Sequence, residues 1–273
     1  MLTAEYSPKY LPCPDKFLMW QIGALGLVFS LLCSGLLICA QNPAVSSSVS
    51  ADPQLSAQKA TPGSPPFIVI GFVGGFVRHD DTVHSTVQLA ARLRADYPSG
   101  VYVKVFENRR REEAHQEILR LLDTNHDGTL SDGEKRNARI IIYGMSWGGS
   151  ETVELARELD KEKIPVLLTI QVDSIVKSGQ NDRVIPANVA EAVNFYQPDG
   201  LLHGQPEIQA ADASRTHILG NYRYDYKSNP IDCDTYPWWD RLFTKQHTEI
   251  ECDTQVWDRV ESLIRSRLPP AHQ

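Results

Sequence analysis

The stretch ARIIIYGMSWGGSETVELARELD, residues 138–160, decides the fold. Its first part, 138–144, is rich in β-branched residues, which is typical of a buried strand, and its last part, 148–160, has the apolar spacing of a helix. The pentapeptide between them, Gly144 to Gly148, reads Gly-x-Ser-x-Gly with Ser146 at its centre. Small residues around a serine permit a sharp strand-to-helix turn that projects the hydroxyl above a sheet.

The same alternation of strand and helix extends on both sides of this stretch. Buried strands are predicted at 67–75, 101–106 and 164–172, helices at 84–97 and 111–122, and a closing amphipathic helix at 255–268. Strands that alternate with helices indicate parallel pairing with right-handed crossovers. The sequence therefore predicts an α/β domain with a mainly parallel sheet flanked by helices on both faces.

The N-terminal part of the chain has a different composition. After a short segment, 1–16, residues 17–40 form a nearly unbroken apolar run without charge, long enough to span a bilayer as one hydrophobic helix. We interpret this run as an uncleaved signal anchor that leaves the domain outside the cytoplasm. A signal peptide cleaved near 49–51, which would release a secreted protein, is the alternative.

A linker joins this run to the folded domain. Residues 41–66 are rich in Ser, Ala, Pro and Gln and have no helical or strand period, as expected of a disordered linker. The domain therefore comprises 67–273. Its only cysteines, Cys233 and Cys252, are expected to form a disulfide in an oxidising compartment, with two free thiols as the alternative.

Composition limits the classes of partner. The chain is 42% hydrophobic and 22% charged, with 27 Lys and Arg against 34 Asp and Glu and a formal net charge of −7. These values exclude wholesale disorder and a polytopic membrane protein. No block of basic residues is present, so no nucleic-acid partner is expected.

The Gly-x-Ser-x-Gly turn in its strand-to-helix context resembles the nucleophile elbow of the α/β-hydrolase superfamily, particularly its lipase, esterase and thioesterase-like members. In that family an acid and then a histidine follow the serine along the chain. The resemblance implies a triad of Ser146, Asp173 at the end of the strand 164–172, and His247 in a loop before the last helix. The alternatives are Asp199, Asp212 and Asp225 for the acid and His217 for the histidine.

The resemblance also implies an oxyanion hole. It would combine the backbone N–H of Trp147 with N–H groups of Gly74 and Gly75 in the glycine-rich loop after the first strand. This loop lacks the Lys-Ser/Thr pair of a phosphate-binding loop, which argues against a nucleotide site. The aromatic residues expected to form an apolar acyl pocket are Phe72, Phe76, Trp147, Tyr196, Trp238 and Trp239.

Residues 123–134, DTNHDGTLSDGE, fit the pattern of an EF-hand calcium loop and resemble one. Oxygen ligands to Ca²⁺ are expected from Asp123, Asn125, Asp127, Thr129, Ser131 and Glu134, and Gly128 permits the turn. The loop is single and is followed by only about one helical turn. We therefore expect a structural ion that ties the helix 111–122 to the strand 138–144, with a turn that binds no ion as the alternative.

These features predict an exported, membrane-tethered serine hydrolase that cleaves an ester or thioester of a small or lipid-like acyl substrate and uses structural calcium. The membrane contact would be made through the N-terminal helix. The alternative is a surface calcium-binding module on a hydrolase scaffold that has lost catalysis. Replacement of Ser146 by alanine distinguishes the two hypotheses, because a non-catalytic module would lose no activity.

Overall fold

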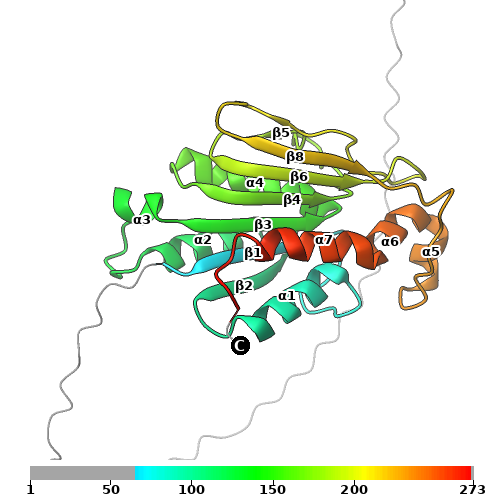
Figure 1. Cartoon of the computed structure of the whole chain (residues 1–273), viewed down its shortest axis with the longest axis horizontal. Coiled ribbons are helices and arrows are strands. Elements are labelled where there is room, and N and C mark those ends of the chain that lie inside the picture. Colours follow the sequence, from blue (N-terminus) through cyan, green and yellow to red (C-terminus); the bar gives the residue numbers. More distant parts are fainter. Residues whose placement is uncertain (1–64, 272–273) are drawn as a thin grey trace, which may run out of the picture. The chain divides into compact units, whose positions relative to one another are not determined.

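The computed structural model describes residues 65–271, which form an α/β fold around one parallel sheet (Figure 1). The six strands lie in the order β2-β1-β3-β4-β6-β8, and every neighbouring pair is parallel. Their bounds are β1 (Phe67–Val73), β2 (Val101–Glu107), β3 (Arg139–Met145), β4 (Val166–Val172), β6 (Val189–Tyr196) and β8 (His217–Arg223). The predicted fold class is confirmed.

Helices cover both faces of the sheet (Figure 1). One face carries α1 (Ser85–Asp96) and α7 (Thr254–Arg265), and the other carries α2 (Arg111–Leu122) and α4 (Trp147–Lys161). Three short helices, α3 (Asp132–Arg136), α5 (Trp238–Phe243) and α6 (Lys245–Cys252), and a small sheet of β5 (Val184–Ile185) and β7 (Gln209–Ala210) complete the described part of the chain. Each helix and strand predicted within 67–273 is found with its ends within a few residues.

The core divides into two clusters because successive strand residues point to opposite faces. In β3, Ile140 and Ile142 pack beneath α2 and α4, whereas Ile141 and Tyr143 pack beneath α1 and α7. All four side chains are fully buried. Burial on both faces explains why β1, β3 and β4 read as continuous apolar runs instead of an alternation.

The predicted anchor at 17–40 lies outside the described residues, as does the linker up to residue 64. Within residues 65–271, no helix has both the length and the apolar character that crossing a membrane requires. The expected cysteine pair does lie in the described part. Cys233 and Cys252 are within disulfide-bonding distance, with their Cα atoms 5.9 Å apart.

Candidate active site

Ser146 occupies a sharp turn between β3 and α4. Its backbone has φ 58° and ψ −126°, a conformation that costs a non-glycine residue about 1–3 kcal/mol. The turn is held from the neighbouring strand, because the Ser146 N–H donates to the Val172 carbonyl at 3.0 Å and its carbonyl accepts from the Ile175 N–H at 3.1 Å. A serine kept in a strained backbone by its surroundings is a candidate for function.

The two motif glycines allow this turn to form. A Cβ atom on Gly144 would lie 2.3 Å from the carbonyl oxygen of Gly148, and one on Gly148 would lie 2.2 Å from the carbonyl oxygen of Phe72. Both clashes are with backbone atoms, which cannot rotate away. The close approach of α4 to β1 and β3 therefore requires glycine at both positions.

Asp173 follows β4, is fully buried and has φ 42°. Its Oδ1 accepts the backbone N–H groups of Gln197 at 3.1 Å and Gly204 at 2.6 Å, and its Oδ2 accepts from Gln197 Nε2 at 2.8 Å. Three donors from one connecting segment thus fix the plane of the carboxylate. Sequence reasoning did not identify Gln197 or Gly204, because neither carries a local signal for this role.

His247 lies on α6, so the prediction of a loop at this position was wrong. A helix this short has too few turns to show periodicity, and it is stabilised by packing of the fully buried Ile250 instead of by its own sequence. The His247 Nδ1 atom lies 2.6 Å from Asp173 Oδ2, and its side chain is 11% exposed. The imidazole therefore has one nitrogen oriented by a buried carboxylate.

The three predicted triad residues meet at one edge of the sheet. Ser146 and Asp173 directly follow Met145 and Val172, which are paired in the parallel register, and His247 reaches Asp173 from α6. No hydrogen bond joins the Ser146 hydroxyl to His247 among the side chains described. Such bonds are often long in ligand-free enzymes and tighten when substrate binds.

The alternative acids have other partners. Asp199 pairs with Lys227 at 2.7 Å, and Asp212 and Asp225 accept from the hydroxyls of Ser214 and Ser228. His217 is exposed at the start of β8. Among the acids considered from the sequence, Asp173 is the one in contact with His247.

The glycine-rich loop after β1 passes beside Ser146. A Cβ atom on Gly74 would lie 2.8 Å from the Ser146 Cβ, and the Gly75 carbonyl accepts from Asn108 Nδ2 at 2.5 Å. Trp147 is the first residue of α4, where backbone N–H groups have no acceptor within the helix. The expected oxyanion donors thus flank the serine on two sides.

A cavity of about 500 Å³ opens next to these donors. Its lining residues are Gly75, Phe76, Asn108, Arg109, Trp147, Val176, Lys177 and Ser178. The rings of Phe76 and Trp147 meet edge to face, with their centroids 5.6 Å apart.

The six aromatic residues predicted to form one acyl pocket do not gather in this cavity. Phe72 is fully buried in the core, and Tyr196 ends β6. Trp238 and Trp239 lie on α5, where they are 61% and 52% exposed. Only Phe76 and Trp147 line the cavity, because aromatic residues that are scattered along the chain serve several separate packing sites.

The predicted calcium loop connects α2 to α3 and is organised by its own side chains. The N–H of Gly128, which has φ 80°, donates to Asp123 Oδ2 at 3.0 Å, and the Thr129 N–H donates to Asp127 Oδ1 at 2.8 Å. Glu134 accepts from the backbone N–H and hydroxyl of Ser131 at 2.9 and 2.8 Å. These hydrogen bonds to Ser131, followed by others to Thr124, lower the pKa of Glu134 to about 2.

The carboxylates of Asp123, Asp127 and Glu134 do not converge on one point. In the described part of the chain, one group of three acidic or histidine side chains has its ligand atoms mutually within 4.8 Å, and it comprises Glu112, His115 and Glu158 outside the loop. Glu134 is engaged instead in a capping box at the start of α3. The donor types suit Ca²⁺, and Glu134 would have to exchange its present partners for the ion.

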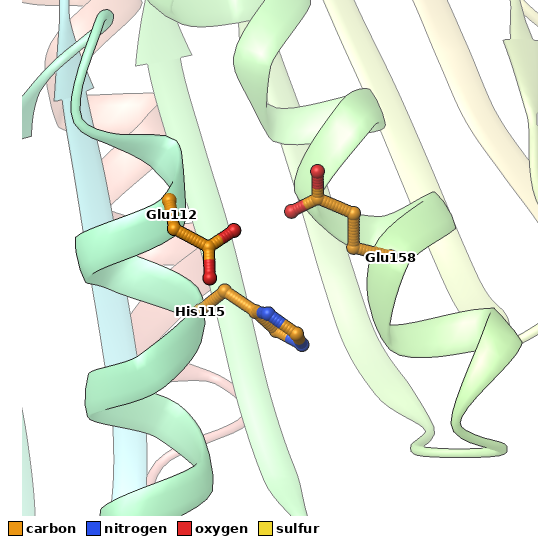
Figure 2. A group of neighbouring side chains, drawn as sticks. All are labelled: Glu112, His115 and Glu158. Atoms are coloured by element: carbon orange, nitrogen blue, oxygen red, sulfur yellow. The ribbon is translucent and has the colours of Figure 1, made fainter.

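The group of Glu112, His115 and Glu158 lies where α2 faces α4 (Figure 2). It is part of an ion-pair network in which Arg111 Nε lies 2.9 Å from Glu158 and His115 Nε2 lies 2.9 Å from Glu162. Arg111 also pairs with Glu151, which is 1% exposed. The network links α2 to the helix that begins at the candidate nucleophile.

Comparisons with known proteins give weak similarities. No protein-family model matches the chain, and no curated protein sequence matches it. Among solved structures it is similar to a cutinase-like protein from Cryptococcus sp., with 14% identity over 78% of this chain and 100% of that chain and a TM-score of 0.40. It is also similar to an acetylxylan esterase, with 10% identity over 76% of this chain and 100% of that chain and a TM-score of 0.37. Human thioesterase 2 matches with 10% identity over 69% of this chain and 98% of that chain and a TM-score of 0.29. These values are too low to assign an activity.

Proposed function

We propose that the domain is a serine hydrolase that cleaves an ester or thioester through Ser146, His247 and Asp173. The observation that carries the proposal is the contact of His247 Nδ1 with the buried Asp173 at the strand end next to the Ser146 turn. A base oriented by a buried acid beside a serine on a strained turn is the arrangement that nucleophilic acyl transfer requires.

In the proposed reaction, His247 Nε2 takes the proton of the Ser146 hydroxyl as Oγ attacks the acyl carbon. The Nδ1–H of His247 donates to Asp173, which sets the tautomer and stabilises the imidazolium. Backbone N–H groups of Trp147 and of Gly74 or Gly75 would hold the oxyanion. His247 then returns the proton to the leaving oxygen or sulfur, and water hydrolyses the acyl-serine by the same route.

Labelling by a fluorophosphonate probe tests the proposal. The full-length protein is expected to react with the probe, and Ser146→Ala is expected to lose all labelling, because only an activated serine attacks the phosphorus. Ser178→Ala is the matched control, since Ser178 is an exposed serine lining the same cavity, and should label like the wild type. A natively folded wild type that stays unlabelled would favour the non-catalytic calcium-binding module instead.

We also propose that residues 123–134 bind one structural Ca²⁺. In support, Asp123, Asn125 and Asp127 offer side-chain oxygens and the positive φ of Gly128 gives the sharp turn of such loops. The ion would hold the end of α2 near the start of β3, since α3 and its connection are short. It would take no part in bond cleavage.

Calcium is expected to raise the melting temperature. With a Kd near 10⁻⁵ M, about 1 mM Ca²⁺ would stabilise the domain by about 2.7 kcal/mol, or roughly 5–10 °C. Glu134→Gln should abolish most of this shift in differential scanning fluorimetry. Asp132→Asn, which changes the exposed first residue of α3 at a position without a ligand role, should retain it. An equal shift in wild type and Glu134→Gln would rule out this loop as the site.

For location, we propose that residues 17–40 anchor the chain and that the domain lies outside the cytoplasm. The proximity of Cys233 and Cys252 supports this, because disulfides persist in oxidising compartments. Protease treatment of intact cells that express the full-length chain should digest the domain. Protection of the domain under these conditions would contradict the proposal.

A further inference from the structure

Three consecutive arginines follow β2, and they differ in their partners. Arg110 lies 3.1 Å from Glu107 and 3.1 Å from Glu113, and Arg111 pairs with Glu151 and Glu158. Arg109 forms no ion pair and no side-chain hydrogen bond within residues 65–271. It is exposed and lines the cavity beside the candidate nucleophile. Arg109 therefore brings to the cavity a positive charge that has no ion-pair partner among the described residues.

A second cation, Lys177, also lines the cavity, and its charge is paired. Lys177 Nζ lies 2.7 Å from Glu151 and 6.0 Å from the centroid of the Trp147 ring. Glu151 is also a partner of Arg111, which pairs with Glu158 as well, so these two cations are matched by two carboxylates. None of the lining residues is acidic, in a chain whose net charge is −7. The lining is thus positive through Arg109, although the protein as a whole is negative.

The position of the cavity decides which part of a substrate enters it. Its lining residues follow β1, β2 and β4 or begin α4, and none belongs to α6. In the proposed reaction His247 protonates the leaving group from α6, so the leaving group must lie toward that helix. The acyl part of the substrate would therefore occupy the cavity, which begins at Gly75 and Trp147 beside the expected oxyanion site.

Given the proposed serine hydrolase function, on which this inference rests, we propose that the cavity binds an acyl group with a short apolar body and a terminal carboxylate. The substrate class is a monoester or monothioester of a dicarboxylic acid. Phe76, Trp147 and Val176 contact the apolar body, and Arg109 binds the carboxylate through its guanidinium. Arg109 is therefore the residue that determines acyl specificity.

Two esters of matched shape test the role of charge. 4-Nitrophenyl hemisuccinate and 4-nitrophenyl 4-methylpentanoate differ in that two carboxylate oxygens replace two methyl groups. The full-length wild type should have the higher kcat/KM on the hemisuccinate, and Ser146→Ala measures the uncatalysed background. Arg109→Gln should lower kcat/KM for the hemisuccinate about 10-fold, mainly through KM, and change the neutral ester less than about 2-fold.

Arg110→Gln is the matched control, because it removes a neighbouring cation that already has two carboxylate partners. This substitution should change kcat/KM by less than about 2-fold for both esters. Raising the ionic strength should reduce the preference of the wild type for the hemisuccinate, because salt screens an exposed guanidinium. Equal kcat/KM values for the two esters, or an equal loss on both in Arg109→Gln, would overturn the inference while leaving the hydrolase proposal intact.

A binding measurement separates the two proposals if neither ester is turned over. Isothermal titration of succinate into wild type and Arg109→Gln reports on the cavity without requiring catalysis. Binding that is weakened about 10-fold in Arg109→Gln would support an anion-binding cavity in a protein that lacks this esterase activity. Absence of binding to the wild type would overturn the inference.

Discussion

Asp173→Asn is expected to lower kcat about 10⁴-fold while the domain remains folded. The reason lies in the fixed orientation of the side chain. Two backbone N–H groups, from Gln197 and Gly204, point at Oδ1, so the amide oxygen of asparagine must take that position. The amide NH₂ then replaces Oδ2 and donates to His247 Nδ1. This places the imidazole proton on Nε2, where it blocks removal of the Ser146 proton.

The same substitution carries a stability cost that the experiment must separate from the loss of activity. The new NH₂ would face Gln197 Nε2, a second donor, in a fully buried site. Two opposed donors cost about 1–3 kcal/mol, which can be measured by urea unfolding. KM for a 4-nitrophenyl ester should change little, because Asp173 does not line the cavity.

Asp199→Asn serves as the matched control for this variant. Asp199 was also a candidate acid from the sequence, but its carboxylate pairs with Lys227. Its replacement should change kcat less than about 2-fold, since its carboxylate pairs with the largely exposed Lys227 and not with His247. Activity of Asp173→Asn within about 10-fold of wild type, or a large loss in Asp199→Asn, would contradict the proposed triad.

The sequence predicted β1 to β4 but not β6 and β8, which lie at one side of the sheet. β1, β3 and β4 are apolar runs, and burial on both faces makes such runs recognisable. β6 includes the buried Asn194, whose amide donates to the Gln205 carbonyl, and β8 contains Gly220 with φ 155°. Polar residues that satisfy tertiary hydrogen bonds break the apolar pattern, so these strands could not be predicted from periodicity.

The candidate site shows the same division between local and long-range signals. Ser146 was found because its turn imposes glycine on neighbours in the sequence, and Asp173 because it ends a predicted strand. The groups that orient Asp173 come from a distant segment, and Arg109 lies at the cavity only because distant segments meet there. No local spacing encodes such contacts, and only the assembled sheet reveals them.

Gly148→Ala is expected to destabilise the domain by about 2 kcal/mol or more. Two effects compete, because alanine is favoured over glycine inside a helix by about 1 kcal/mol, whereas overpacking costs about 1–3 kcal/mol and in some cases more. At this position the added Cβ would lie 2.2 Å from the Phe72 carbonyl oxygen and 2.7 Å from its carbon. Relief would require α4 to move off β1, carrying the Ser146 turn with it. The clash therefore outweighs the helical preference.

Gly133→Ala is the same substitution in a helix without the clash, and its effect on the stability of the domain should have the opposite sign. Gly133 lies in α3, and the nearest atom to its added Cβ is Ser131 Oγ at 3.8 Å. Urea unfolding followed by tryptophan fluorescence at constant calcium should show Gly133→Ala equal to wild type or up to about 1 kcal/mol more stable. Gly148→Ala should unfold at much lower urea and fail to label with the fluorophosphonate probe. If both variants shifted stability alike, helix propensity would govern both positions, and the tight crossing of α4 over β1 would not be what holds Ser146 in its strained turn.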